Sequence, residues 1–228
     1  MDYVYTCRQG NNEELRYSLR SIEQNMPAGR VWVIGYRPDW YIGDFIQVKD
    51  VGNKFENIKN CISKIIKNND ISNNFILMND DFFALKKNNS IINYHGGSLE
   101  NKIIRYKEKR MSPKYIKLLE LTLKELKNNG IENPIDYDIH VPMTMDKNML
   151  EKALDFAFFP RSSYGNLTKL QAVEISDVKI YSRDGKIQWN NVVNNNFVST
   201  EDTSFTLLKQ NVLNEMFSNR SSLENPNY

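Results

Sequence analysis

Three consecutive polar residues are the clearest candidates for a chemical role in this sequence. They are Asn79, Asp80 and Asp81, which follow the apolar run 75–78. A short apolar run of this length is typical of a strand that is buried on both faces. Ionised carboxylates at the end of such a strand need a partner, and Mg²⁺ or Mn²⁺ holding a diphosphate is a suitable one. Asp81 is therefore predicted to bind the metal, and Asp80 to orient a bound sugar or ribose. The alternative is a turn or helix cap whose carboxylates face water.

His140 is a second candidate metal ligand, because imidazole and carboxylate together are a common ligand set for Mn²⁺. It lies in the stretch 137–142, which Pro142 biases toward extended backbone. The alternative is that His140 packs beside Pro142 and forms a hydrogen bond with a backbone group.

Six arginines are candidates for contacts with phosphate, since a guanidinium group matches phosphate oxygens in a planar, bidentate manner. They are Arg8, Arg16, Arg20, Arg105, Arg110 and Arg161. Arg8 lies in the first loop after a predicted strand and is expected to border a bound nucleotide. Arg161 lies in the polar segment 160–166, which is predicted to be a loop, and is expected to face a diphosphate or an acceptor. Arg16 and Arg20 lie four residues apart on one helix face, where a solvated pair with neighbouring glutamates is the alternative.

Two acidic residues near the C-terminus, Glu201 and Asp202, follow a short apolar segment and precede a predicted helix. A helix cap with acids in the first turn explains this pattern. As a functional alternative, either carboxylate could take a proton from an acceptor hydroxyl.

Hydrophobic periodicity predicts the elements that position these side chains. Strands are predicted over residues 3–7, 31–34, 45–48 and 75–78, with amphipathic helices after the first and the third. This order indicates an α/β fold with a mostly parallel central sheet. In such sheets ligands bind beyond the carboxyl ends of the strands, where the loop 8–12 and the segment 79–81 are both expected.

The second half of the chain is predicted to form a helical and hairpin portion. Helices are expected over residues 113–128, 146–156 and 205–217, and a hairpin over 173–189 around a turn at 183–185. A single domain is expected over residues 1–217, followed by a polar, frayed tail over residues 218–228.

Composition limits the class of protein. The chain has 228 residues, 40% of them hydrophobic, and a net charge of +2. No apolar run approaches the roughly 20 residues of a membrane span, and the N-terminus does not resemble a secretory signal. Cys7 and Cys61, the two cysteines, lack metal-type spacing and fit a reduced environment, so a cytoplasmic protein is expected.

Several segments, taken together, resemble a known family. Residues 11–22, NNEELRYSLRSI, are similar to the GND-x-x-ELRYSLRSIE segment of Stealth-type sugar-phosphate transferases and related capsule enzymes, with Asn12 in place of the usual Asp. Residues 75–83 are similar to a strand of these proteins that ends in FNDDMF. Residues 138–143 and 161–166 resemble later segments of the same group, so the resemblance covers most of residues 1–205 in order.

This resemblance implies a single glycosyltransferase A-like (Rossmann-like) domain that binds a nucleotide-sugar, UDP- or GDP-linked, with Mn²⁺ or Mg²⁺. We expect a glycosyltransferase that moves the sugar to a hydroxyl of a glycan or of a modified base in viral DNA, which the basic run 102–117 would suit. One alternative is transfer of a sugar 1-phosphate, and another is a nucleotide-sugar-binding module without activity. The expected nucleotide contacts are Arg8, Gly10, Asn11, Asn79 and Asp80, and the expected catalytic residues are Asp80, Arg161, Glu201 and Asp202.

Overall fold

The computed structural model describes residues 1–155 and 159–228. The contacts of the chain divide it into two compact units. Unit 1 comprises Met1–Ile91, His140–Pro142 and Val178–Tyr228, and unit 2 comprises Ile92–Ile139 and Met143–Asp177. The prediction of one domain over residues 1–217 stays a prediction. No helix in the described ranges has both the length and the apolar character needed to cross a membrane.

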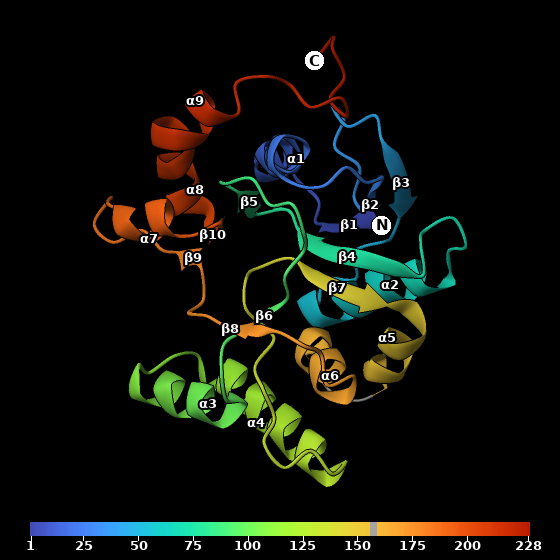
Figure 1. Ribbon diagram of the computed structural model, residues 1–228, viewed down its shortest axis with the longest axis vertical. Helices are drawn as coiled ribbons and strands as arrows, with labels where there is room; N and C mark the ends of the chain where they lie inside the picture. Colours follow the sequence, from blue (N-terminus) through green and yellow to red (C-terminus); the bar gives the residue numbers. More distant parts are fainter. Residues whose placement is uncertain (156–158) are drawn as a thin grey trace. The chain divides into compact units, whose positions relative to one another are not determined.

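Unit 1 alternates strands and helices, as the sequence predicts (Figure 1). Its first half contains β1 (Asp2–Cys7), α1 (Glu13–Asn25), β2 (Val31–Gly35), β3 (Asp44–Gln47), α2 (Lys54–Lys67), β4 (Asn74–Asn79) and β5 (Phe82–Ala84). Its second half contains β9 (Lys179–Ile180), α7 (Trp189–Asn194), β10 (Phe197–Thr200), α8 (Asp202–Leu208), the π-helical turn η1 (Lys209–Leu213) and α9 (Asn214–Met216).

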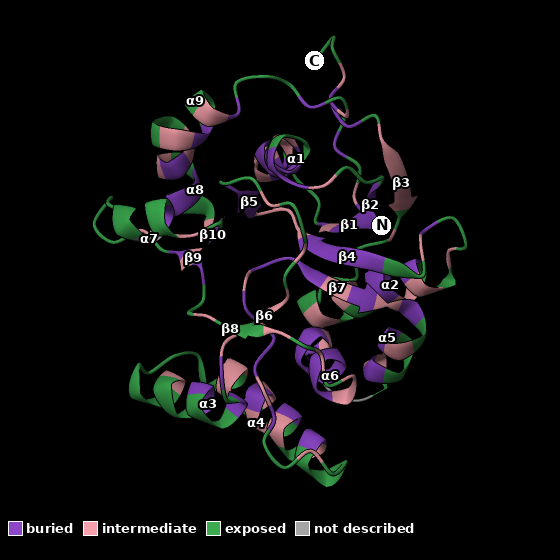
Figure 2. Ribbon diagram, viewed as in Figure 1, coloured by how far each residue is buried: buried purple, intermediate pink, exposed green. Residues whose placement is uncertain are grey.

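Four strands of unit 1 form a parallel sheet in the order β3, β2, β1, β4. Strand β1 pairs with β2 on one side, where Tyr3 lies beside Val31, and with β4 on the other, where Tyr3 lies beside Ile76. Strand β4 is buried from its second to its fifth residue and exposed at its first (Figure 2). The α/β class and the mostly parallel sheet predicted from the sequence are therefore confirmed.

The direction of chain travel reverses at β1. Helix α1 carries the chain from β1 to β2, and α2 returns it from β3 to β4, on the other side of β1. Right-handed crossovers in opposite directions place their helices on opposite faces of a sheet, which is where Figure 1 shows α1 and α2. The carboxyl ends of β1 and β4 therefore flank a topological switch point, which is where open α/β sheets bind ligands.

A second, smaller sheet in unit 1 has the strand order β5, β10, β9. Strand β10 runs antiparallel to β5 and parallel to β9. Apolar side chains on one face of this sheet pack with α1 and the C-terminal helices; Phe83 of β5, for example, stacks on Phe205 of α8. This packing connects the C-terminal part of unit 1 to β5, the strand that follows Asp80 and Asp81.

Unit 2 is mainly helical. It contains β6 (Tyr94–His95), α3 (Leu99–Glu108), α4 (Pro113–Asn128), β7 (Met143–Asp146), α5 (Lys147–Leu154), α6 (Pro160–Leu167) and β8 (Val173–Glu174). Its interior holds an ion pair between Lys102 and Asp136, whose atoms Nζ and Oδ2 are 2.8 Å apart. The helix predicted over 113–128 is confirmed as α4. Asp146 caps α5, whereas the predicted end of that helix, Phe156, lies outside the described residues.

The predicted loop at 160–166 is wrong, because these residues form helix α6. Pro160 occupies the first helical position, where its missing N–H and fixed φ are tolerated. The helix is stabilised by packing of small residues rather than by a row of apolar ones. A side chain at Gly165 would place Cβ only 2.4 Å from the ring of Tyr137, and the Asn166 side chain bonds to the backbone of Ile135.

The hairpin predicted over 173–189 is also wrong. The turn at 183–185 is present, but the two segments that flank it do not pair with each other. Asp184 and Gly185 have positive φ angles, and Arg183 and Lys186 form an isolated bridge. The flanking segments pair with other strands, because β9 joins β10 in unit 1 and β8 joins β6 in unit 2.

The predicted fraying of residues 218–228 is wrong as well. Ser221 is 3% exposed and Glu224 is 6% exposed, and Glu224 forms an isolated bridge with Tyr41. Two partly buried arginines bind the Glu224 carboxylate, which explains why a polar segment is held in place.

Candidate functional site

A cleft of about 1240 Å³ opens in unit 1 beyond the carboxyl ends of the four parallel strands. Its wall includes the residues that follow β1, β2, β3 and β4, together with the start of α2. At its floor, Gly35 has a φ of 120°, and a Cβ there would lie 2.3 Å from the carbonyl oxygen of Cys7. Only glycine therefore lets the ends of β1 and β2 approach so closely.

The cleft brings together most of the predicted site residues. Arg8, Asn79, Asp80, Asp81, His140, Glu201 and Asp202 all line it. They come from four separate parts of the chain, so the fold of unit 1 is what places them at one edge. Their predicted roles stay predictions.

Asp81 is held by two side chains of the smaller sheet. The hydroxyl of Ser199 donates to Asp81 Oδ2 at 2.6 Å, and Lys179 Nζ lies 3.2 Å from the same oxygen. The Lys179 and Asp81 side chains are 19% and 16% exposed. One carboxylate oxygen is thus fixed, while Oδ1 accepts no hydrogen bond from the described residues.

Asp80 lies in a less favourable place for a charge. The residue is partly exposed to solvent, but its carboxyl group is surrounded by protein atoms and is poorly solvated. Burial raises the pKa of Asp80 to about 7, the neighbouring charge of Asp81 adds to the rise, and Arg8 opposes it. A pKa in this range marks a carboxyl group whose charge is not matched by the surrounding protein.

Arg8 and Asp202 form an exposed ion pair at the mouth of the cleft. Arg8 Nη2 lies 3.0 Å from Asp202 Oδ1, and the two side chains are 67% and 82% exposed. The hydrogen bond that Arg8 donates to Asp202 raises the pKa of Arg8. A contact this exposed to water exchanges readily with a bound ligand.

The loop after β1 borders a second pocket of unit 1, of about 480 Å³, whose lining includes Gly10 and Asn11. Asn12 adopts left-handed backbone with a φ of 50°, and its side-chain amide donates to the carbonyl oxygens of Arg8 and Gly10. The carbonyl of Asn11 accepts a hydrogen bond from the Trp40 indole at 3.0 Å. The side chain of Asn12 therefore holds the loop after β1 together and makes no capping hydrogen bond to α1.

Glu201 has the helix-cap role that the sequence allowed. It is the N-cap of α8, where its side chain and Ser204 form a capping box, and its Oε1 also accepts a bond from the Ser182 backbone. This carboxylate is engaged in holding the start of the helix. Asp202 is the more accessible of the two acids.

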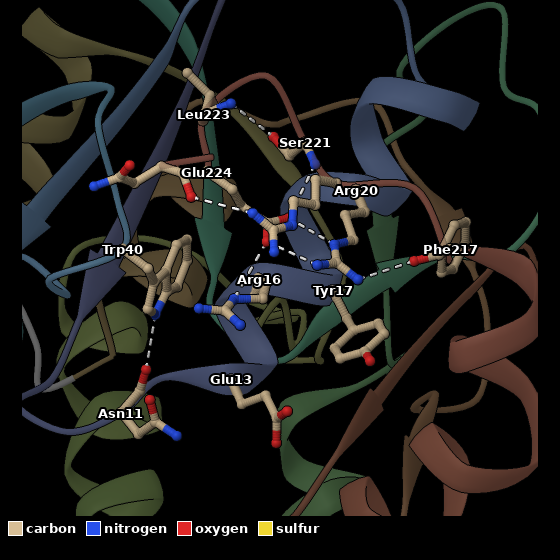
Figure 3. Close-up of polar contacts among 12 residues, drawn as sticks. Asn11, Glu13, Arg16, Tyr17, Arg20, Trp40, Phe217, Ser221, Leu223 and Glu224 are labelled. Atoms are coloured by element: carbon tan, nitrogen blue, oxygen red, sulfur yellow. Dashed lines mark hydrogen bonds and ion pairs between the residues drawn. The ribbon is translucent and has the colours of Figure 1, made fainter. Parts of the chain in front are cut away.

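The solvated-pair alternative for Arg16 and Arg20 is wrong, because both arginines bind Glu224 (Figure 3). Arg20 donates two bonds to the Glu224 carboxylate, at 2.5 and 2.7 Å, and one to the carbonyl of Phe217. Arg16 Nε lies 3.3 Å from Glu224 Oε2, and its guanidinium group lies over the Trp40 ring. These two arginines stabilise the fold of unit 1.

Arg161 lies elsewhere in the chain, in helix α6 of unit 2, and is 8% exposed. Its predicted contact with a diphosphate or an acceptor stays a prediction. The other candidate arginines, Arg105 and Arg110, also belong to unit 2, in and just after α3.

Sequence reasoning missed three residues of the cleft region: Lys179, Ser199 and Thr200. The side chains of Lys179 and Ser199 contact Asp81. Thr200 is among the residues that line the cleft, and its hydroxyl group is buried. The alternation of β10 could have indicated that Ser199 faces one side and Thr200 the other, but no pattern pairs them with residues about a hundred positions earlier.

Among the described residues, no three His, Cys, Asp or Glu side chains gather closely enough to hold a metal ion by themselves. Neither a comparison with models of known protein families nor a comparison with curated proteins finds a match for this chain.

Proposed function

We propose that the chain is a glycosyltransferase whose unit 1 binds a nucleotide-sugar donor in the cleft. The observation that supports this most strongly is the position of Asp80 and Asp81 in a large cleft at the switch point of a parallel sheet. Such crevices bind nucleotides in open α/β folds. The cleft combines carboxylates with lysines and arginines, which suits a diphosphate joined to a polar sugar.

The donor set fits Mg²⁺ or Mn²⁺. These ions prefer oxygen ligands and typically take one or two carboxylates, completing their shell with substrate phosphates and water. Asp81 would hold the ion through Oδ1, since Ser199 and Lys179 fix the other oxygen and so orient the group. Asp80 and His140 line the same cleft. When bound, the ion supplies positive charge to the leaving diphosphate.

Donor binding and proton transfer are assigned to residues of the chain. Asp80 orients the donor sugar or ribose, and Arg8 contacts the nucleotide. The bond between the anomeric carbon and the diphosphate oxygen breaks, its electron pair leaves on the diphosphate, and the acceptor oxygen bonds to the anomeric carbon. Asp202 accepts the proton of the acceptor hydroxyl, because its carboxylate is exposed in the cleft while Glu201 is engaged in a helix cap.

The reaction is tested by incubating the protein with a panel of UDP- and GDP-sugars and Mn²⁺, together with glycan or modified-DNA acceptors. Release of UDP or GDP, with the sugar on an acceptor, is the expected result. Release of UMP or GMP would instead establish sugar-1-phosphate transfer, because that reaction attacks the β-phosphorus. Donor binding without any product would identify a non-catalytic module.

The role of Asp81 is tested with Asp81→Asn, which keeps the shape and removes the charge. Transfer should fall by roughly 10²–10³, the usual effect of losing a contact that stabilises transition-state charge. Asp39→Asn, a change at an exposed aspartate, is the matched control. Full activity of the unchanged protein in EDTA would rule out the metal and leave Asp81 as a base or a structural group.

A further inference from the structure

The second pocket of unit 1, which the loop after β1 borders, adjoins the cleft. Its volume of about 480 Å³ is within the usual range for sites that bind small molecules. One wall is the loop after β1 together with the start of α1. The other wall is a single face of α8 and η1, because its lining residues recur three and four positions apart. These residues are Asp202, Phe205, Thr206, Lys209 and Gln210.

The second pocket and the cleft share part of their lining. The residues that line both are Arg8, Gln9, Glu14 and Asp202, whereas Asp80 and Asp81 line the cleft. Asp202 is the proposed base for the acceptor hydroxyl. A molecule in the second pocket would therefore reach this base while a donor occupies the cleft.

The charges of the second pocket do not suit a polyanion. Lys209 Nζ lies 2.6 Å from Glu13 Oε1, and Arg8 is paired with Asp202, so both cations of the lining are matched by carboxylates. Glu14 is partly exposed and makes no hydrogen bond or ion pair with the described residues. The described lining thus has three carboxylates against two cations, and it would repel a chain of phosphates.

The polar groups of the lining suit a neutral sugar. Sugar hydroxyl groups both donate and accept hydrogen bonds, so they can use carboxylate, amide and hydroxyl side chains alike. Glu14 offers acceptor oxygens, while Gln9 and Gln210 offer both donors and acceptors. Thr206 adds a hydroxyl group from an exposed position on α8.

We propose that the second pocket binds the acceptor and that the acceptor is a neutral sugar unit of a glycan rather than a base of DNA. Glu14 accepts hydrogen bonds from the sugar hydroxyls, and one hydroxyl points to Asp202. This inference rests on the proposed function for the identity of the bound sugar as an acceptor. Its own content is recognition of a neutral sugar in this pocket.

The test measures binding of the methyl glycosides of glucose, galactose and N-acetylglucosamine to the full chain by saturation-transfer NMR. A single-stranded DNA oligonucleotide is the second probe. Thr206→Trp places a large ring in the pocket, and Asn211→Trp places the same ring at an exposed position of η1 that lines neither the pocket nor the cleft. At least one glycoside should give a signal with the unchanged protein and with Asn211→Trp, and none with Thr206→Trp.

Glu14→Gln tests the carboxylate separately. Glycoside affinity should fall by about tenfold, the usual effect of losing a hydrogen bond to a charged group. The melting temperature should not change, because Glu14 has no ion pair to lose. Glu215→Gln, at an exposed glutamate outside both cavities, is the control. A lower melting temperature with unchanged glycoside affinity would show that Glu14 serves the fold, and would remove it from the site.

The outcomes distinguish this inference from the proposed function. Equal glycoside signals in Thr206→Trp and Asn211→Trp, or no glycoside signal at all, would overturn the acceptor pocket even if the protein transfers sugar. An oligonucleotide signal that only Thr206→Trp abolishes would also overturn it, because the pocket would then bind nucleic acid. Glycoside binding that only Thr206→Trp abolishes would support the pocket even if no nucleotide-sugar is consumed.

Discussion

Arg20 and Arg8 both pair with an acidic residue near the C-terminus, but their surroundings differ. Arg20 makes two bonds to Glu224, and the two side chains are 11% and 4% exposed. Arg8 makes one bond to Asp202, and those side chains are 67% and 82% exposed. The first pair joins α1 to the C-terminal segment (Figure 3), and the second lines the cleft.

Arginine therefore serves two purposes in unit 1: it stabilises the fold at Arg20 and lines the cleft at Arg8. Around Glu224, two guanidinium groups and the backbone N–H of Ser221 match the carboxylate charge. In the cleft, the charge of Asp80 is poorly matched, as its raised pKa shows. Matched charges in the interior fix the fold, whereas unmatched charges in a cleft remain available to a ligand.

The largest effect is expected from Glu224→Ala. Two largely buried guanidinium groups lose their partner, so the free energy of unfolding should fall by about 3 kcal/mol. Urea denaturation measures this change, and Glu215→Ala, at an exposed glutamate, is the control. Equal stability of the two variants would show that the Glu224 cluster does not hold unit 1 together.

Lowering the pH should remove the stability that the Glu224 carboxylate contributes. Burial raises the pKa of Glu224, but the bonds from Arg20 and from the Ser221 backbone, with the nearby charge of Arg16, lower it by more, so the net shift is downward. A carboxylate whose pKa is lowered by folding stabilises the protein above its unfolded pKa of about 4.3, and this contribution is lost as the pH falls through the folded pKa. The stability difference between the unchanged protein and Glu224→Gln should therefore shrink between pH 7 and pH 3. A difference that stays constant would contradict the downward shift.

Asp80→Asn should act in the opposite direction on stability. Burial and the adjacent Asp81 disfavour the ionised form of Asp80, so removing its charge should stabilise the empty protein by about 1 kcal/mol at pH 8. Sugar transfer should fall in the same variant, which is a common trade between stability and activity. Thermal unfolding and the transfer assay are the two measurements, and a loss of stability would mean that Asp80 has a structural partner.

The smallest change in stability is expected from Arg8→Gln. Exposed ion pairs contribute about 0–1 kcal/mol, so unfolding should change by at most about 0.5 kcal/mol. Binding of UDP should nevertheless weaken by about tenfold, the usual effect of losing a charged hydrogen bond. Arg30→Gln breaks another exposed pair, with Asp44, and should leave UDP binding unchanged. Equal UDP affinity in the two variants would remove Arg8 from the nucleotide site.

The sequence predicted the first half of unit 1 well because its strands and helices carry regular apolar patterns. The position of Asp80 and Asp81 at a sheet edge followed directly, since they come right after a buried strand. Helix α6 was missed because its buried face is made of Ser162, Ser163, Gly165 and Asn166, which show no apolar period.

Local sequence patterns do not predict contacts between distant segments. Lys179 and Ser199 lie 98 and 118 residues after their partner Asp81. Strand β9, which carries Lys179, has only two residues, too few to show an alternation. The contact of Arg16 and Arg20 with Glu224 was missed for the same reason, because charge patterns on a helix reveal only partners on that helix.

The bond between Arg20 and Glu224 joins residues that are 204 positions apart. At roughly 5–20 residues per second, a ribosome takes roughly 10–40 s to make the intervening chain. During that time the guanidinium groups of α1 have only water, salt ions and the glutamates of the same helix as partners. The growing chain therefore exposes a basic, aromatic-flanked face of α1 until the last segment is made, and a chaperone that favours such a face has a defined period in which to bind it.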